Sequence, residues 1–384
     1  MKRKICVILT TRGNYAKMKP VMKAISKREG LELQVILGGG AVLPKYGDLT
    51  TIIRRDGFVL DRILHFLIEG ENLVTMTQSA GFATIEMARA FNDLAPDIVL
   101  VIADRFEALS IAMSAFYMNI IVAHIEGGEV SGSIDESIRH AITKLSHLHF
   151  PANTAAAERI IKLGEDSEKV FVVGTTSLDQ LSEIELEDVS SLFEFQRTTG
   201  VGSDLDFRKD FNVVLQHPVV TEYQDNLKNI NETIAAVDEL KIPTVWIWPN
   251  MDAGSDGIAK GIRMFREMKN PDYIHYFKSV PFKEYAKLLF NCRCLVGNSS
   301  SGIRESAFLG TPVVNIGTRQ DGRDRGRNVL DVPYDRQQIK QAISRQMANG
   351  LYPSDDLYGD GRAGHKISEI LATVDLKVQK TIAY

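Results

Sequence analysis

Cysteine is scarce in this chain, which has only three in 384 residues: Cys6, Cys292 and Cys294. So few cysteines cannot form a disulfide framework, and their scarcity is typical of a reducing compartment, so we expect a cytoplasmic protein. Cys292 and Cys294 are separated by one residue rather than by the two of a CxxC motif. Packing is therefore the preferred interpretation of this pair over a metal or redox site.

Long hydrophobic runs and an excess of positive charge are also lacking. The longest uncharged span, residues 108–123, falls short of the roughly 18–20 apolar residues that cross a bilayer, and polar residues interrupt it. The apolar run Ile5–Leu9 is shorter than the roughly 7–15 residues of a signal-peptide core. With a net charge of −4, no overall basic field favours nucleic acid or an anionic membrane. We expect neither as a partner.

What the chain does have is an alternation of strand-like and helix-like segments. Such alternation predicts parallel sheets covered by helices on both faces, which is the α/β class. The predicted strands are residues 5–9, 31–37, 98–103, 120–123, 147–150, 170–173, 212–216, 244–248, 273–277, 294–296 and 313–316.

The length of the chain predicts two domains, because one hydrophobic core rarely covers more than about 250–300 residues. We expect an N-terminal domain at residues 1–180 and a C-terminal domain at 205–363. Between them, residues 181–204 are predicted to be a linker, since an acidic stretch there is followed by one poor in large apolar residues. Residues 364–384 are predicted to form a helix that packs back on the first domain.

Acidic residues follow two of the strand-like runs in the first domain. Asp104 and Glu126 come at the ends of such runs, and Glu136 lies in a helix predicted to start at residue 134. Ligands of open α/β sheets bind beyond the carboxyl ends of parallel strands. These carboxylates are therefore candidates for acid–base chemistry.

A serine-rich loop in the second domain, GNSSSG, lies between a predicted strand and a predicted helix. Backbone N–H groups and hydroxyls collect at a helix N-terminus, where the dipole favours an anion. The residues predicted to cradle a phosphate are Ser299, Ser300, Ser301 and Gly302. Glu305 follows near the start of the helix, where it either accepts hydrogen bonds from ribose hydroxyls or is a solvated first-turn residue.

Arginines gather after the strand predicted at 313–316, in the segment GTRQDGRDRGR. Arginine suits phosphate, although a charged run is also typical of a solvated face. We favour diphosphate binding, with Arg319 foremost. His217 comes at the end of another predicted strand with proline behind it, which favours a site residue over a core histidine.

Five motifs in this order, ADRFEA, HIEGGEVSGSIDESIRH, WPNMDAGS, GNSSSGIRE and GTRQDGRDRG, resemble those of the hydrolysing UDP-N-acetylglucosamine 2-epimerases of sialic acid biosynthesis. The resemblance covers nearly the whole chain. It implies the GT-B fold, in which two Rossmann-like domains face each other across a cleft. It also implies an enzyme that eliminates UDP to give 2-acetamidoglucal and then hydrates this intermediate to N-acetylmannosamine.

The resemblance carries roles to individual positions. Asp104, Glu126 and Glu136 match the catalytic acidic residues, and His217 matches a histidine near the diphosphate. The residues implied to bind the UDP-sugar are Arg12, Arg105, Arg139, Asn250, Asp256, Ser299, Ser300, Ser301, Gly302, Glu305 and Arg319. Arg105 and Arg139 are expected to hold the carboxylates in orientation. Ala103 stands where a glycine commonly precedes the Asp-Arg pair, which leaves the sugar specificity open.

The implied chemistry needs no metal and no organic cofactor, and we expect none. His140, His147 and His149 could suggest zinc, but no nearby cysteine or acidic triplet completes the set. A homo-oligomer, either a dimer or a tetramer, is expected.

Three alternatives remain open. The substrate could be the UDP-linked 2,4-diacetamido-trideoxy sugar of legionaminic acid biosynthesis, with the same mechanism. A GT-B glycosyltransferase and a non-enzymatic nucleotide-sugar sensor are the others. The sequence also leaves open which carboxylate is base, acid or stabiliser of the cation.

Overall fold

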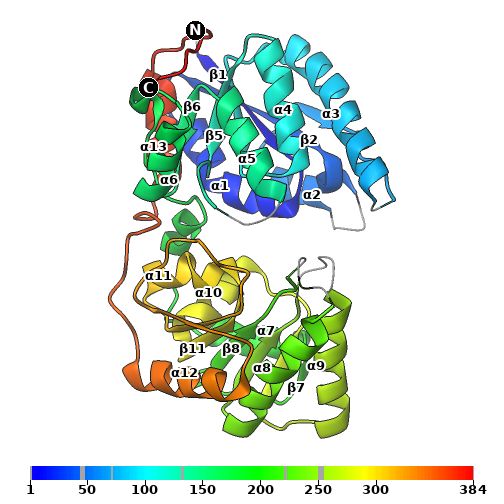
Figure 1. Cartoon of the computed structure of the whole chain (residues 1–384). Coiled ribbons are helices and arrows are strands. Elements are labelled where there is room, and N and C mark those ends of the chain that lie inside the picture. The colour runs from blue at the N-terminus through cyan, green and yellow to red at the C-terminus, as the bar shows by residue number, and fades with distance from the viewer. Residues whose placement is uncertain are drawn as a thin grey trace. The chain divides into compact units, whose positions relative to one another are not determined.

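The chain folds into two compact units, Met1–Gln180 with Gly359–Tyr384 and Leu181–Tyr358 (Figure 1). This computed structural model describes residues 2–43, 48–70, 72–130, 134–219, 222, 224–249 and 255–383, with the backbone only at 134, 135 and 255. Within these residues, no helix is both long and apolar enough to cross a membrane.

The first unit is built on a six-stranded parallel sheet in the order β3-β2-β1-β4-β5-β6. Its strands are β1 (Arg3–Leu9), β2 (Leu31–Gly38), β3 (Arg62–Leu64), β4 (Ile98–Ile102), β5 (Ile121–Ile125) and β6 (Leu148–Phe150). The order reverses between β1 and β4, which is the switch point where open α/β sheets bind ligands at the carboxyl ends of their strands.

Helices cover both faces of this sheet, and the two-residue period of β1 shows how. Ile5, Val7 and Leu9 enter one core, while Cys6 and Ile8 enter the other. The first core is covered by α1 (Arg12–Lys27), α2 (Leu49–Arg55) and α13 (Ala363–Thr373), and the second by α3 (Leu73–Leu94), α4 (Phe106–Tyr117) and α5 (Ile134–Leu145). A further helix, α6 (Thr154–Lys162), follows β6.

The second unit has a seven-stranded sheet in the order β13-β12-β11-β8-β9-β10-β7, in which only β7 pairs antiparallel. Its strands are β7 (Val201–Gly202), β8 (Asn212–Leu215), β9 (Thr244–Ile247), β10 (Ile274–Phe277), β11 (Cys294–Gly297), β12 (Val313–Ile316) and β13 (Val329–Val332). Its helices are α7 (Ser190–Thr198), α8 (Asn226–Leu240), α9 (Ser255–Lys269), α10 (Phe282–Asn291), α11 (Glu305–Leu309) and α12 (Arg336–Asn349). Cys292 and Cys294 are buried thiols in this unit.

The strand predicted at residues 170–173 is wrong. Only Val170 forms a bridge, to His149, although Phe171 N–H donates to His149 O at 2.9 Å and Val173 N–H donates to Pro151 O at 3.2 Å. A ladder cannot continue here because Pro151, directly after β6, has no N–H to return.

Residues 181–204, predicted to be a linker, contain regular structure in the second unit. Helix α7 buries Leu192 in a core of that unit, and β7 pairs with β10. The Gln196 side chain both accepts from Leu205 N–H at 2.9 Å and donates to Leu205 O at 3.2 Å. These contacts, and not the polar composition of the segment, determine its conformation.

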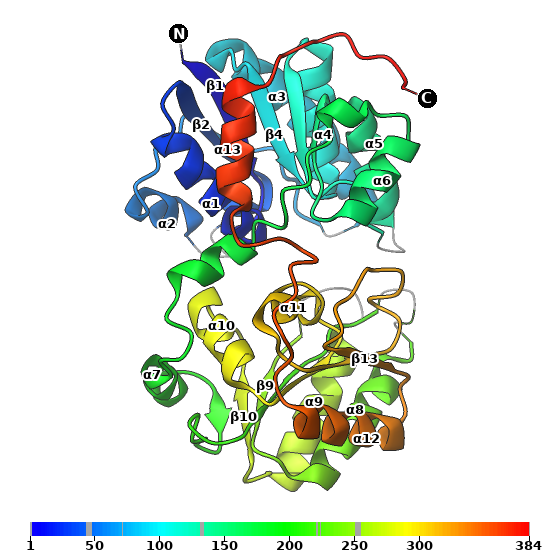
Figure 2. The same cartoon turned by 90° about the vertical axis from the view of Figure 1, so that its left-hand side faces the viewer.

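Helix α13 completes the first unit from the far end of the chain, lying along α1 (Figure 2). It ends at Thr373, so the prediction of a helix that continues to residue 384 is wrong. Its Ile367 and Leu371 are fully buried in the core that contains α1 and β1. The Asp179 carboxylate caps its N-terminus, accepting from Ala363 N–H at 2.9 Å and Gly364 N–H at 2.7 Å. The first unit is therefore assembled from two separate stretches of the chain.

Leu371→Ala is expected to lower the free energy of unfolding of the first unit by about 2–5 kcal/mol, because a deleted core leucine leaves a cavity. Both tryptophans, Trp246 and Trp248, lie in the second unit. In urea titrations, the part of the helical circular dichroism signal that comes from the first unit should therefore be lost at a lower urea concentration. The urea midpoint of tryptophan fluorescence, which reports on the second unit, should stay unchanged. Glu369→Ala, at an exposed position of the same helix, is the matched control. Equal shifts in both signals would contradict the assignment of α13 to the first unit.

Candidate functional site

Two predicted carboxylates follow neighbouring parallel strands of the first unit. Asp104 comes two residues after β4 and Glu126 directly after β5, and Ile102 lies in register with Ile125. The backbone turns sharply after each of these two strands, with φ of +60° at Ala103 and +59° at Glu126. The left-handed conformation costs a residue with a Cβ roughly 1–2 kcal/mol, which explains why glycine suits position 103.

Asp104 is held by a cation from α5. The Arg139 guanidinium is nearly fully buried and forms an ion pair with the Asp104 carboxylate. Its other terminal nitrogen donates to Glu129 O at 2.6 Å. Arg139 is therefore paired with one of the carboxylates that it is predicted to orient.

Glu126 is 2% exposed, and each of its carboxylate oxygens has a partner. Lys17 Nζ lies 2.6 Å from Oε2, and Thr175 Oγ1 donates to Oε1 at 2.7 Å. Sequence reasoning missed both partners. Their signal in the sequence is weak, because Lys17 lies in the helix after β1 and Thr175 follows the segment predicted to be a strand.

Glu136, the third predicted carboxylate, is half-buried on α5, one turn before Arg139. The Nε2 atom of His140 lies 3.6 Å from its Oε1. The structure thus places Asp104 and Glu126 at one edge of the sheet and Glu136 on the helix that supplies the partner of Asp104.

Other residues predicted in the first unit have different surroundings. Arg105 donates to both oxygens of the buried Glu107 at 3.1 and 3.0 Å, and Glu107 is not one of the three predicted carboxylates. The expectation that Arg105 orients them is corrected, because Glu107 lies two residues away in the first turn of α4. Arg12 is the exposed first residue of α1.

In the second unit, Asn298 organises the end of the sheet. Its side chain accepts from His217 N–H at 2.6 Å and donates to His217 O at 2.9 Å. Its backbone carbonyl accepts from Arg319 at 3.2 Å and from the Gln320 side chain at 2.8 Å. Asn298 therefore joins three loops, one from each of three neighbouring strands, and it was not among the predicted site residues.

His217 is buried beside Arg319. Burial, and next the charge of Arg319, lower the pKa of His217 to about 3. The imidazole is therefore neutral at pH 7 and can donate only one hydrogen bond.

The serine loop forms a 3₁₀ turn, Ser300–Gly302, before the short helix α11. Ser299 and Ser301 hydroxyls lie 2.9 Å apart, and Ser301 also bonds to the Tyr285 hydroxyl. Glu305 is the half-buried first residue of α11. The hydroxyls of Ser299 and Ser301 are thus hydrogen-bonded to each other, directly after Asn298 in the chain.

The arginines that follow β12 do not share one role. Arg325 pairs with Asp331 and donates to Gln320 O at 2.6 Å, so it braces the loop. Arg319 reaches Asn298, beside His217. Arg319 is therefore placed beside His217, another predicted site residue. Asp256 is exposed in the first turn of α9, and Asn250 lies outside the described residues.

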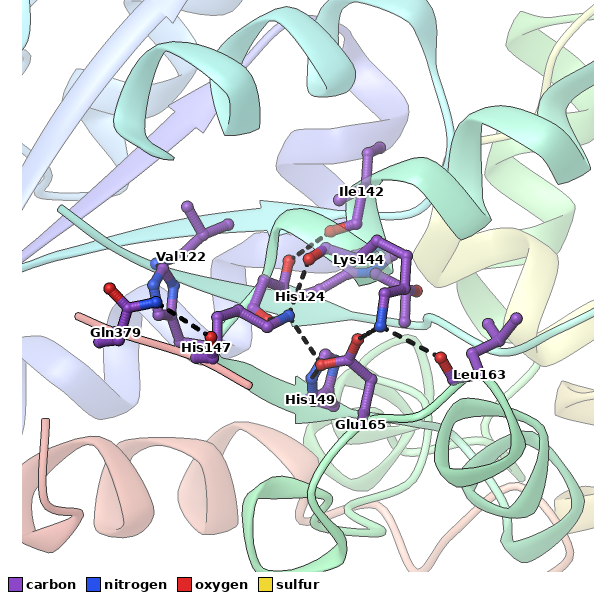
Figure 3. Close-up of polar contacts among 12 residues, drawn as sticks. Val122, His124, Ile142, Lys144, His147, His149, Leu163, Glu165 and Gln379 are labelled. Atoms are coloured by element: carbon purple, nitrogen blue, oxygen red, sulfur yellow. Dashed lines mark hydrogen bonds and ion pairs between the residues drawn. The ribbon is translucent and has the colours of Figure 1, made fainter. Parts of the chain in front are cut away.

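His147 and His149, considered as zinc ligands, hold the end of the chain instead (Figure 3). His147 Nε2 donates to Val378 O at 3.0 Å, and His149 Nε2 lies 3.1 Å from the Glu165 carboxylate, which also binds Lys380 at 2.7 Å. Burial alone would raise the pKa of Glu165, but its hydrogen bonds outweigh it and lower the pKa to about 2. Across the described part of the chain, no three metal-ligating side chains cluster.

The low pKa of His217 makes the stability of the second unit depend on pH. Between pH 6.5 and about 3 the unfolded chain binds a proton at this histidine that the folded unit does not. The free energy of unfolding should therefore fall as the pH drops through this window, by up to about 1.4 kcal/mol per pH unit, and be constant above it.

Urea midpoints from tryptophan fluorescence at pH 7.5 and 5.0 measure this dependence. His217→Gln should show a smaller loss than the native chain, whereas the control His365→Gln, at an exposed position of the first unit, should not. An unchanged pH dependence in His217→Gln would contradict the neutral buried state.

Comparison with known proteins supports the expected family. The family model described as UDP-N-acetylglucosamine 2-epimerase matches residues 23–372. The chain is 31% identical over 379 residues to a Legionella pneumophila protein named UDP-N,N'-diacetylbacillosamine 2-epimerase (hydrolyzing), covering 99% of this chain and 98% of that one. It is 30% identical over 361 residues to the UDP-N-acetylglucosamine 2-epimerase of Neisseria meningitidis, covering 94% and 92%.

A solved structure shows the same fold. The UDP-GlcNAc 2-epimerase from Neisseria meningitidis bound to UDP-GlcNAc aligns with a TM-score of 0.79 at 18% identity, covering 96% of this chain and 99% of that chain. The predicted fold class, two Rossmann-like domains of the GT-B type, is confirmed. The chain belongs to the UDP-N-acetylglucosamine 2-epimerase family.

Proposed function

We propose that this chain is a hydrolysing 2-epimerase that converts UDP-N-acetylglucosamine to N-acetylmannosamine and UDP, for the synthesis of sialic-acid-type sugars. The observation that carries the proposal is the set of three carboxylates in the first unit, two at adjacent strand ends and one on α5. The family and the names of its relatives direct this acid–base chemistry to C2 of a UDP-linked 2-acetamido sugar.

The first step is elimination of UDP. The C2 proton is not next to a carbonyl, so it becomes removable only as the bond from C1 to the diphosphate oxygen breaks and positive charge develops at C1. One carboxylate removes the proton, the C2–H electrons form the C1–C2 double bond, and UDP departs with the former C1–O pair. Asp104 and Glu126 suit this step because they follow adjacent parallel strands, at the edge of the sheet where ligands of open α/β folds bind.

The second step is hydration of the 2-acetamidoglucal. A carboxylate removes a proton from water as the water oxygen bonds to C1. A carboxylic acid protonates C2 on the ring face opposite to the one from which the C2 proton was removed. Glu136 suits proton exchange, since it is half-buried and the Nε2 atom of His140 lies 3.6 Å from its Oε1. Water is consumed, and the released sugar has the inverted configuration at C2.

The departing diphosphate needs hydrogen-bond donors in fixed positions, and the second unit contains candidates for them. The residues proposed to bind it are Arg319, His217 and the serine loop, which all adjoin Asn298. One lost donor in such a preorganised site typically costs about 2.7–4 kcal/mol of transition-state stabilisation. A neutral His217 donates a hydrogen bond without adding charge.

A second substrate is favoured by one observation. The Legionella relative named for UDP-N,N'-diacetylbacillosamine is 31% identical over 99% of this chain, as similar as the relative named for UDP-N-acetylglucosamine. The same three carboxylates would serve the UDP-linked 2,4-diacetamido-trideoxy sugar, because the reaction involves only C1 and C2. This alternative would place the enzyme in legionaminic acid biosynthesis.

Incubation with each UDP-sugar, without any acceptor, tests the proposal. UDP-N-acetylglucosamine is expected to give equal amounts of UDP and free N-acetylmannosamine, with ¹⁸O from labelled water at C1 of the sugar and deuterium from D₂O at C2. Formation of UDP-N-acetylmannosamine would instead establish a non-hydrolysing epimerase. Turnover of the diacetamido sugar alone would establish the alternative substrate, and UDP release only with an added acceptor would establish a glycosyltransferase.

Asp104→Asn, Glu126→Gln and Glu136→Gln should each lower kcat by about 10²-fold or more, because each removes one acid–base group. Calorimetry should show that all three still bind UDP, since its proposed contacts are in the second unit. Glu86→Gln, on the surface helix α3, is the control and should keep native turnover. Native rates in all three site variants would refute the assignment of the carboxylates.

A further inference from the structure

The turn that carries Asp104 is fixed on both sides by β5. Ala103 N–H donates to Ile125 O at 3.0 Å, and Ala103 O lies 2.8 Å from Nε2 of His124. Because Ala103 has a left-handed φ of +60°, the turn needs such contacts to persist. The orientation of Asp104 therefore depends on the carbonyl that precedes it.

His124 is fully buried, and its tautomer follows from its partners. Burial is the main cause that lowers the pKa of His124, to about 4, so the ring is neutral and has one N–H. A carbonyl can only accept, so the N–H is on Nε2 and points at Ala103 O. The Nδ1 atom is then an acceptor, and the Thr143 hydroxyl lies 3.2 Å from it.

Thr143 connects this imidazole to α5. It is fully buried and lies one turn after Arg139, the cationic partner of Asp104. Gly127 leaves room for the contact, because a Cβ there would come within 2.8 Å of His124 Nδ1 and 3.1 Å of Thr143 Oγ1. Helix α5 thus contacts the Asp104 carboxylate through Arg139, and it supports the preceding backbone carbonyl through Thr143 and His124.

We propose that Thr143 and His124 are positioning residues for Asp104: the Thr143 hydroxyl donates to His124 Nδ1, which fixes the Nε2–H tautomer that holds the Ala103 carbonyl and so the Asp104 turn. This proposal rests on the proposed function in taking Asp104 as a catalytic residue. Neither Thr143 nor His124 touches the substrate in it.

Thr143→Val and Thr143→Ser form the matched test, because valine keeps the shape and loses the hydroxyl while serine keeps the hydroxyl. Thr143→Val should lower kcat about tenfold, equivalent to about 1.4 kcal/mol, with KM within twofold. Thr143→Ser should recover at least half of the native kcat. A native kcat in Thr143→Val, or equal losses in both variants, would overturn the proposal.

A readout without turnover separates this proposal from the proposed function. In ¹⁵N-histidine NMR, with the signal assigned by its loss in His124→Gln, native His124 should show the neutral Nε2–H tautomer. The Nδ1 resonance should move on Thr143→Val and stay near its native position on Thr143→Ser. A native Nδ1–H tautomer, or no movement in Thr143→Val, would overturn the positioning role. Absence of turnover on every UDP-sugar would instead refute the proposed function.

Discussion

The first unit depends on one constraint, which is that a charge taken out of water must meet a partner. Glu126 and Arg139 are both almost completely buried, and each such ion would cost several kcal/mol if it were left alone. Helix α1 therefore has to bring Lys17 to the end of β5, and α5 has to bring Arg139 to the end of β4. The pairing fixes both helices relative to the sheet edge where the carboxylates lie. Stability and the proposed chemistry thus require the same contacts.

In the second unit, the loops at the end of the sheet are joined mainly by hydrogen bonds of neutral groups. Asn298 satisfies the backbone of His217 with its amide and accepts from Arg319 with its carbonyl, so three loops meet without a buried carboxylate. His217 is itself neutral. Such an arrangement of N–H donors beside one arginine favours an anionic ligand, whereas the carboxylates of the first unit are paired with cations of their own. The candidate acid–base residues and the candidate anion-binding residues thus lie in different units.

The sequence predicted the features that are local. The alternation of strands and helices predicted the α/β class. The positions of Asp104 and Glu126 after strand-like runs predicted that both lie at one edge of the sheet, because parallel strands share one carboxyl edge. Contacts between distant segments were not predictable: Lys17 is 109 positions from Glu126, and the side chain and backbone carbonyl of Asn298 have their partners in other loops. The segment 170–173 has a β-branched and aromatic composition that favours a strand, yet a proline on its neighbour prevents the ladder. Pairing depends on what the adjacent chain can donate, which composition does not show.

The discontinuity of the first unit has a consequence for the order in which the protein can fold. Domains of a growing chain usually fold one after another from the N-terminus. Here β1 and α1 are made first, but the core between them stays open until α13 supplies Ile367 and Leu371. The second unit, which is contiguous from Leu181 to Tyr358, has all of its residues available earlier. On the ribosome, the later-encoded unit is therefore the first that can be completed, and the unit carrying the carboxylates closes last.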